Sequence, residues 1–600
     1  MKKYKISLLI VSAILLTAFI FVELRDNNTD NYIYEKGLIL SKESGFYDDA
    51  FLLEISAPTD EIYYTLDGSE PDRSSVRYSN PIMIDDATNN ENTNSSRDDI
   101  SAGYNDELIQ EVNEKYKIYN DTLEEDERMS EEDIDRSISS PNYRIPDYCV
   151  DKCVVIKAVY YDNDVKSDVK TAVYFIGFEK KDTFNNGNVI VISMDSDDWF
   201  GYDNGIYVTG ATFDNFLAAD GIDFAKNPNS PYWWWWDANY RNKGSNCERE
   251  ASVQIFSNGK NVINQQAGIR IQGGGSRGYA QKSLNIYSRD EYENGSFEYS
   301  FWEDGYYPKK MTLTACGDDW YSKIQDRIVA DLSQDANLNV VTMNFRPYTL
   351  FLNGEFWGFY YLTEKYDANY LNYHYGVDKD SVVIVKNGLL EVGDEEDYDD
   401  YQEMMRFLSY EDMSDENNYK KACELFDMDS MIDYMAMELY VGRYGDWPAG
   451  NIQMWKTKSK GIGRYNDSRW RWMVFDQNSG GLTGMYTSRG NDVSCIDTLK
   501  YAREKAPWFD NLCRNDEFRK KLSAKIIDLG KNTFSAENVN SVIDEYVAEI
   551  ELPMSATIKR FWGADDYNFR IEIESVRQFF NKRYDYMIQF LQDDFGIKEE

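Results

Sequence analysis

The chain has 600 residues, enough for about three or four domains, and 42% of them are hydrophobic, which is ample for packed cores. Its formal net charge of −41 argues against binding to nucleic acid or to an anionic membrane surface, because phosphate groups are bound by basic surfaces. The same charge favours a basic partner, although most of the carboxylates are expected to be solvated surface.

The first 25 residues have the architecture of an export signal. Three lysines, Lys2, Lys3 and Lys5, precede an apolar run from Ile6 to Val22, which is close to the shortest helix that spans a bilayer. No clean small-residue cleavage site follows the run, so a cleaved signal peptide and a signal anchor both remain open. We expect an exported protein, extracellular or at the cell surface, that meets a membrane only through this segment.

Cysteine and histidine are scarce in this chain. Seven cysteines are too few for a disulfide scaffold, and the one histidine, His374, argues against Ser-His-Asp or Cys-His catalysis and against a structural zinc site. His374 lies in LNYHYG, an expected helix end, where we interpret it as a surface or capping residue.

Residues 37–177 are predicted to form a small immunoglobulin-like β-sandwich. Short alternating runs at 51–55 and 61–66 are followed by turn residues at 67–69. The segments IYYTLDGSEPDRSSVRYSNPIMI and CVVIKAVYYDNDVKSDVKTAVYFI resemble the chitobiase/β-hexosaminidase C-terminal-type module, which implies a spacer or a surface-association role. An insertion at about 87–142 is rich in Asn, Asp, Glu and Ser, has too few large apolar residues to fold alone, and is predicted to be mobile.

Four consecutive tryptophans stand at Trp233–Trp236, and in neither a helix nor a strand can all four face inward. We favour a loop that flanks the core. Stacking on sugar rings is the alternative, and it leaves cell-wall or glycan association open.

A glycine turn followed by a lysine lies in GIRIQGGGSRGYAQKSLNIYSR, between an expected strand at 268–272 and a second strand that carries Lys282. The turn consists of Gly273, Gly274, Gly275, Ser276 and Arg277. Glycines let backbone N–H groups approach phosphate oxygens, and a nearby lysine can reach the α- and β-phosphates of a nucleotide. A flexible hairpin turn is the alternative interpretation.

Three polar residues further along the chain have the order found in Mg²⁺-dependent phosphoryl transferases. Asp446 precedes Asn451 by five positions, and a Trp-rich apolar segment then ends in Asp476. In such enzymes the first Asp accepts the proton of the attacking hydroxyl, whereas the Asn and the second Asp hold the metal. Because Mg²⁺ prefers oxygen ligands, carboxylate and carboxamide side chains suit it.

These motifs together resemble the CotH (spore coat protein H) kinase family. The resemblance covers about residues 185–595 and also includes LFLNGEFWGFYYLTEKYDANYL, WRWMVFDQNSGGL and APWFDNLCRNDEFRKKL. It implies an α+β fold, an atypical two-lobed protein-kinase-like domain behind the sandwich, with ATP and Mg²⁺ as cofactors and proteins phosphorylated on serine.

The resemblance also implies roles for individual residues. Lys282 would hold the nucleotide phosphates under the Gly273–Arg277 turn, Asp446 would be the catalytic base, and Asn451 and Asp476 would bind the metal. Glu364 is placed at a hinge that meets the adenine or the ribose. The expected helix at 318–334 offers Asp319, Asp326 and Asp331 as partners for Lys282, and Gln477-Asn478 stands where familiar kinases have Phe-Gly.

We therefore predict an exported ATP/Mg²⁺-dependent kinase that phosphorylates Ser/Thr hydroxyls of surface or secreted proteins. Acidic runs such as 393–403 could steer a Lys/Arg/Ser-rich protein substrate toward the cleft. The alternatives are a catalytically inactive surface adhesion or scaffold protein, and a carbohydrate-binding or carbohydrate-active protein.

Overall fold

The structure is a computed structural model that describes residues 37–597 apart from residues 185, 446 and 479–492. The expected export segment at 1–25 lies outside the described residues. Within the described part of the chain, no helix has the length and apolar character needed to cross a bilayer.

The N-terminal module is a β-sandwich whose strands are short. Its main sheet has the strand order β2 (Gly45–Tyr47), β10 (Lys170–Ile176), β8 (Val154–Asp162), β5 (Ile62–Thr65) and β6 (Val76–Arg77), with β9 (Val165–Lys166) paired to β8. Two further pairs join β3 (Phe51–Leu53) to β7 (Ile82–Ile84) and β1 (Ile39–Leu40) to β4 (Ile55–Ser56). The inward-facing residues of these strands, such as Leu53, Ile156 and Tyr174, form a core of their own. This confirms the predicted sandwich.

The insertion within the sandwich is helical and packed, so the prediction that 87–142 is mobile is wrong. It contains η1 (Ala102–Tyr104), α2 (Asp106–Asn120) and α3 (Glu131–Ser137), and Ile109, Val112 and Ile134 are buried in the same core as the neighbouring barrel. The segment has too few apolar residues to form its own core, as the sequence indicated, but a neighbouring domain supplies the other half of the contact.

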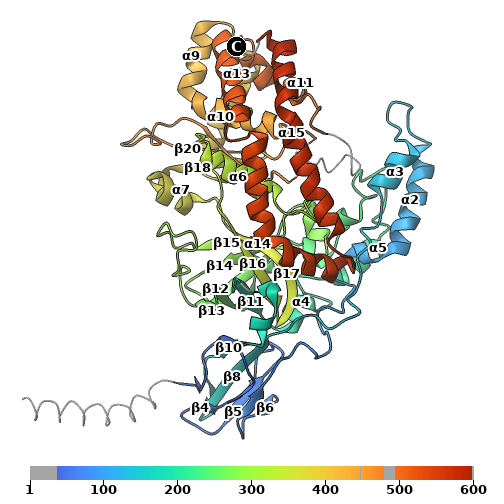
Figure 1. Cartoon of the computed structure of the whole chain (residues 1–600), viewed down its shortest axis with the longest axis vertical. Helices are drawn as coiled ribbons and strands as arrows, with labels where there is room; N and C mark the ends of the chain where they lie inside the picture. The colour runs from blue at the N-terminus through green and yellow to red at the C-terminus, as the bar shows by residue number, and fades with distance from the viewer. Residues whose placement is uncertain (1–36, 185, 446, 479–492, 598–600) are drawn as a thin grey trace, which may run out of the picture.

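The middle of the molecule is a closed barrel of seven strands (Figure 1). In barrel order these are β11 (Val189–Ser193), β12 (Arg249–Ser257), β13 (Lys260–Gln272), β14 (Ser283–Tyr287), β15 (Lys310–Thr314), β17 (Glu355–Glu364) and β16 (Phe345–Leu352). Parallel pairing of β11 with β16 closes the ring, which leaves the barrel without an exposed edge. The short elements around it are η2 (Phe178–Lys180), η3 (Asp182–Phe184), α4 (Ser196–Phe200), α5 (Gly210–Ala218), η4 (Trp233–Trp235), η5 (Asn239–Arg241), η6 (Ser245–Cys247) and η7 (Gly275–Gly278).

The second lobe is mostly helical and is built around a four-stranded sheet with the order β19 (Leu389–Val392), β18 (Val382–Lys386), β20 (Gln453–Thr457) and β21 (Arg471–Met473). Its helices are α6 (Gln325–Asp335), α7 (Ala368–Tyr375), η8 (Lys379–Ser381), α8 (Glu395–Tyr410), α9 (Glu416–Leu425), α10 (Met428–Tyr440), α11 (Thr498–Lys505), α12 (Pro507–Leu512), α13 (Asp516–Lys531), α14 (Ala536–Trp562) and α15 (Tyr567–Phe595). The two long helices α14 and α15 run side by side from this lobe toward the barrel (Figure 1). The α+β, two-lobed prediction is confirmed.

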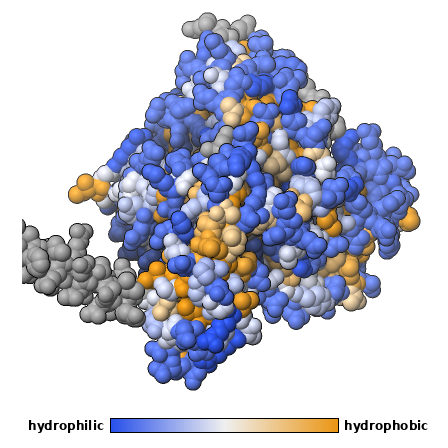
Figure 2. All heavy atoms as spheres, turned by 60° about the horizontal axis from the view of Figure 1, so that its bottom comes forward, coloured by the Kyte–Doolittle hydropathy of each residue, from blue (hydrophilic) through white to orange (hydrophobic). Residues whose placement is uncertain are grey.

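The surface agrees with the large negative charge. The face in Figure 2 is mostly hydrophilic, and apolar atoms gather only in limited patches. The apolar residues are mainly internal, where they fill one core in the barrel lobe, two cores in the helical lobe and further cores in and beside the sandwich.

Candidate active site

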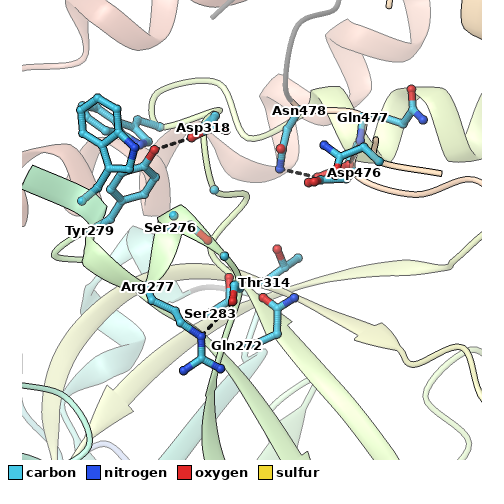
Figure 3. A pocket seen from close by; sticks show the side chains of 18 of the residues that line it. Gln272, Ser276, Arg277, Tyr279, Ser283, Thr314, Asp318, Asp476, Gln477 and Asn478 are labelled. Carbon is cyan, nitrogen blue, oxygen red and sulfur yellow. Dashed lines mark hydrogen bonds between the residues drawn. The ribbon is translucent and has the colours of Figure 1, made fainter. Parts of the chain in front are cut away.

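A cavity of about 1510 Å³ lies between the barrel and the helical lobe. Both lobes line it, the barrel with the glycine turn and the second lobe with Asn451 and Asp476. Figure 3 shows Ser276 and Tyr279 on one wall, with Asp476, Gln477 and Asn478 across from them. The cavity therefore brings together motifs that are about 200 residues apart in the sequence.

The glycine turn adopts a backbone that its glycines permit. Gly273 has φ of +119°, which side-chain-bearing residues rarely adopt, and a Cβ at that position would lie 2.4 Å from the Ser276 Oγ. A Cβ on Gly278 would lie 2.6 Å from the Cα of Trp234. The glycines allow a close turn whose residues Gly273, Gly274, Gly275, Ser276 and Arg277 all line the cavity. Their role in binding phosphate stays a prediction.

Arg277 holds this turn together. Its guanidinium donates hydrogen bonds to the backbone oxygens of Gly273 (2.8 Å), Ile271 (2.6 Å), Tyr240 (3.1 Å) and Asn242 (3.1 Å). Burial lowers the pKa of Arg277 to about 10, and the nearby Arg241 contributes in the same direction. Because its donors are used on carbonyl groups, Arg277 shapes the loop more than it offers a charge to a ligand.

The prediction for Lys282 is wrong, since this lysine points away from the cavity. Its side chain is fully buried, with Nζ 2.5 Å from the Tyr279 carbonyl oxygen and 3.9 Å from the centroid of the Tyr240 ring. The alternation of side chains explains this. Leu284 and Ile286 of β14 belong to the barrel core, so Lys282 faces inward with them, and Ser283 faces the cavity instead. Lys282 therefore cannot hold a phosphate in this cavity.

Lys386 and Lys365 do line the cavity, and the sequence analysis missed them. Lys386 ends β18, and its Nζ lies 3.7 Å from the centroid of the ring of Phe475, the residue before Asp476. Burial lowers the pKa of Lys386, while the charges of Glu391 and Asp476 act in the opposite direction. Lys386 is thus the ammonium group beside the expected metal ligand. Its position after the buried run VVIV, at the end of a strand, was the available sequence signal.

Asn451 and Asp476 flank the pair of strands β20 and β21 in the sequence. Asn451 precedes β20 and Asp476 follows β21, and these strands pair antiparallel, which brings both residues to one end of the sheet. Both have left-handed backbones, with φ of 50° and 57°. For residues other than glycine this is uncommon and is typical of functional loops. Asp446, the predicted catalytic base, lies outside the described residues.

Asp326, in the first turn of α6, fixes the loop that carries Asp476. Its Oδ1 accepts the backbone N–H of Gln477 (2.7 Å), and its Oδ2 accepts a hydrogen bond from Asn478 Nδ2 (2.6 Å). Burial raises the pKa of Asp326 to about 7, and the charge of Asp476 is the next cause. A cation at Asp476 would relieve this repulsion. The oxygen donors of Asn451 and Asp476, with Asp326 behind them, therefore fit Mg²⁺.

Gln477 and Asn478, which stand where familiar kinases have Phe-Gly, tie the loop after Asp476 to both α6 and α10. Gln477 Nε2 donates to Oε1 of the buried Glu438 (2.8 Å), and Glu438 also lies 3.5 Å from the buried Arg443. This polar network replaces a packed phenylalanine, so the loop is held by hydrogen bonds.

Glu364 lines the cavity at the end of β17, where the lobes meet, but its carboxylate already has partners. Oε2 accepts a hydrogen bond from Asn344 Nδ2 (2.8 Å), and Oε1 lies 2.9 Å from His374 Nε2. Its side chain has no exposed surface. The proposed contact with adenine or ribose stays a prediction.

The four tryptophans differ in burial, and Trp233, Trp234 and Trp235 all line the cavity. Trp233 and Trp236 are buried, whereas Trp234 and Trp235 are half-buried and cover the glycine turn. Arg241 lies 4.6 Å from the centroid of the Trp235 ring. Residues 136, 137 and 139–142 of the insertion also line the cavity.

Comparison with known families agrees with this geometry. A family model described as CotH kinase protein matches residues 269–587, and one described as Fn3 associated matches residues 52–174. A search among curated proteins finds no match. The first match contains the glycine turn, Asn451 and Asp476, and the second coincides with the sandwich and its insertion.

Proposed function

The chain belongs to the CotH kinase family, and on this premise we propose that it transfers the γ-phosphoryl group of ATP, with Mg²⁺, to serine or threonine hydroxyls of a protein. The observation that supports this most directly is that the Gly273–Gly275 turn, Asn451 and Asp476 line one cavity. Along the chain these residues also follow one another in the order that is found in protein kinases.

The residues have distinct tasks in this proposal. The backbone of the glycine turn and Lys386 hold the phosphates, while Asn451 and Asp476 hold Mg²⁺, which neutralises phosphate charge when bound. Asp326 keeps the Asp476 loop in place. Asp446 is assigned as the general base from the family resemblance. Because such catalysis depends on positioning and charge, these groups must be prearranged.

The substrate and the location are also part of the proposal. The N-terminal segment supports export to the cell surface or beyond, and the charge of −41 supports a substrate whose acceptor serines lie among lysines and arginines. The protein substrate would enter the cavity on the side that residues of the insertion line.

Phosphorylation assays on the full chain test the proposal. With labelled ATP, Mg²⁺ and a lysine- and serine-rich acceptor protein, we expect Asp476→Asn to reduce incorporation by about 100-fold or more. Asp593→Asn, at an exposed position of α15, is the matched control and should be unchanged. A wild-type chain that shows neither labelling nor a thermal shift with ATP and Mg²⁺ would instead indicate an inactive scaffold.

A further inference from the structure

Three potential metal ligands lie close together where the barrel meets the helical lobe. Asp304 belongs to the loop before β15, Glu364 ends β17, and His374 stands in the last turn of α7. One ligand atom from each lies within 4.8 Å of the other two. His374 is the one histidine of the sequence, which makes this cluster distinctive in a chain full of carboxylates.

We propose that Asp304, Glu364 and His374 form a metal site, separate from the Mg²⁺ site at Asp476, that takes a divalent transition ion of the zinc type. This inference does not depend on the proposed kinase activity. Imidazole nitrogen together with carboxylate oxygen suits Zn²⁺ and its neighbours, whereas Mg²⁺ prefers oxygen ligands alone.

The distances agree with such an ion. His374 Nε2 lies 2.9 Å from Glu364 Oε1 and 3.8 Å from Asp304 Oδ2. Ligand atoms of a tetrahedral zinc ion lie roughly 3.4 Å apart when the bonds are about 2.1 Å long. Small shifts of the side chains would therefore place all three around one ion, with the fourth position left for water.

The outer oxygens of both carboxylates are already fixed. Asn344 Nδ2 donates to Glu364 Oε2 (2.8 Å), and Asp304 Oδ1 lies 3.0 Å from both the Ser300 Oγ and the backbone N–H of Tyr306. This leaves Oε1 and Oδ2 turned toward the same imidazole nitrogen. Hydrogen bonds that orient ligands from behind are typical of metal sites.

Hydrogen bonding within the protein does not satisfy this arrangement. Nε2 carries at most one hydrogen, and Glu364 Oε1 is within hydrogen-bond distance of it while Asp304 Oδ2 is not. Among the described residues, no hydrogen bond to Asp304 Oδ2 is found. A cation would meet all three atoms at once and offset two negative charges.

The surroundings provide rigidity and access. The imidazole ring is flanked by Tyr370, Tyr306 and Tyr373, whose ring centroids lie 4.3, 5.2 and 5.2 Å away. Glu364 forms the buried floor, while the Asp304 side chain is 27% exposed, so an ion could reach the site from the solvent. Bound metal would tie the 304 loop and α7 to the end of β17.

Cobalt titration of the full chain in an Asp476→Asn background tests the proposal, since that substitution weakens the expected Mg²⁺ site. We expect one equivalent of Co²⁺ to bind with a visible absorption band that Zn²⁺ abolishes, and the bound metal to raise the unfolding temperature. His374→Phe keeps a ring among the tyrosines but should lose the band and weaken Co²⁺ binding by about 100-fold. Mutating residues that only hydrogen-bond to a metal ligand costs about 10- to 100-fold in affinity, and loss of a ligand itself should cost at least as much.

Two further variants make the result decisive. Asp304→Asn, in an exposed loop, should weaken Co²⁺ binding by at least about tenfold. Asp380→Asn, an exposed carboxylate in η8, is the matched control and should bind as the parent does. Absence of a saturable band, or equal binding by His374→Phe, would overturn the proposal and leave a structural His374–Glu364 hydrogen bond. A wild-type chain that lacks kinase activity, while the Asp476→Asn chain still binds cobalt, would refute only the proposed function.

Discussion

At the residue scale, the direction of the Lys282 side chain leaves Lys386 as the proposed phosphate-binding lysine of the cavity. Lys282 follows the glycine turn as a phosphate-binding lysine should, yet its Nζ is buried among Tyr240, Tyr207 and the Tyr279 carbonyl. Burial lowers its pKa, followed by the charges of Arg277 and Arg241. Lys386 comes from a different sheet and stands beside Asp476.

Nucleotide binding by two lysine variants tests whether Lys386, and not Lys282, contacts the phosphates. Lys282→Met should change the Kd for ATP with Mg²⁺ by less than about twofold, because Lys282 does not line the cavity. A substitution that shares no contact partners with a binding site usually changes its free energy by under ~0.5 kcal/mol. Lys386→Met should weaken binding about tenfold or more, the usual effect of losing ~1.5–3 kcal/mol from a hydrogen bond to a charged group. Isothermal titration of both variants measures this, and the opposite ranking would return the role to Lys282.

At the element scale, the insertion is part of the barrel lobe. The backbone N–H groups of Thr93, Asn94 and Ser95 donate to the Glu355 carboxylate on β17, at 2.6, 3.1 and 2.7 Å. Helix α2 turns Ile109 into the barrel core and leaves Ile118 71% exposed. The polar composition of residues 87–142 suggested a mobile segment. The apolar surface on which the insertion packs belongs to the barrel, which is formed by later residues of the chain.

Paired substitutions in α2 measure this packing. Ile109→Ala should lower the free energy of unfolding by about 2–4 kcal/mol, since it leaves a cavity in a core shared with the barrel. Ile118→Ala, the same change at an exposed site, should alter it by no more than ~0.5 kcal/mol. Denaturant titration of both proteins gives these values, and a small effect for Ile109 would mean that the insertion is not packed on the barrel.

A second element-scale prediction concerns acid stability at Asp467, which anchors the loop before β21. Burial would raise its pKa, but hydrogen bonds from Arg471 and Arg469 outweigh burial and lower the pKa to about 2. A carboxylate with a lowered folded-state pKa stabilises the fold above its ordinary pKa near 4, and this contribution disappears as pH falls through about 2.

Asp467→Asn should therefore destabilise the protein at pH 7, and its difference from wild type should shrink between about pH 4 and pH 2. Chemical denaturation across this range measures the effect. A difference that does not depend on pH would show that the carboxylate charge is not what matters.

At the scale of the whole molecule, the sandwich, its insertion and the barrel share buried surface. Phe175 of the sandwich packs on Phe256 and Phe351 of the barrel, with ring centroids 5.5 Å apart in both pairs. The cluster around them joins the two modules, and residues 136, 137 and 139–142 line the cavity. The N-terminal module is thus structurally continuous with the barrel lobe.

A truncation tests this continuity. A fragment of residues 185–600 should unfold at a lower temperature than one of residues 37–600 and should bind a hydrophobic dye, because the apolar contacts of the sandwich and of the insertion would be exposed. Calorimetry and dye fluorescence compare the two. Equal stability would indicate that the N-terminal module is an independent spacer, as its sequence resemblance alone implied.

From the sequence alone, strand patterns and turn residues predicted the sandwich, and the resemblance of the motifs between the glycine turn and Asp476 predicted the two-lobed α+β fold and the family. Each motif can be recognised this way because it is formed by residues that are neighbours in the sequence. Only the tertiary structure decided that Lys282 faces the barrel core, that Asp326 holds the loop after Asp476 and that His374 meets two carboxylates. The face of a strand residue depends on how the strand packs against its neighbours, and contacts between distant segments depend on the whole fold. Neither is encoded in the spacing of the residues concerned.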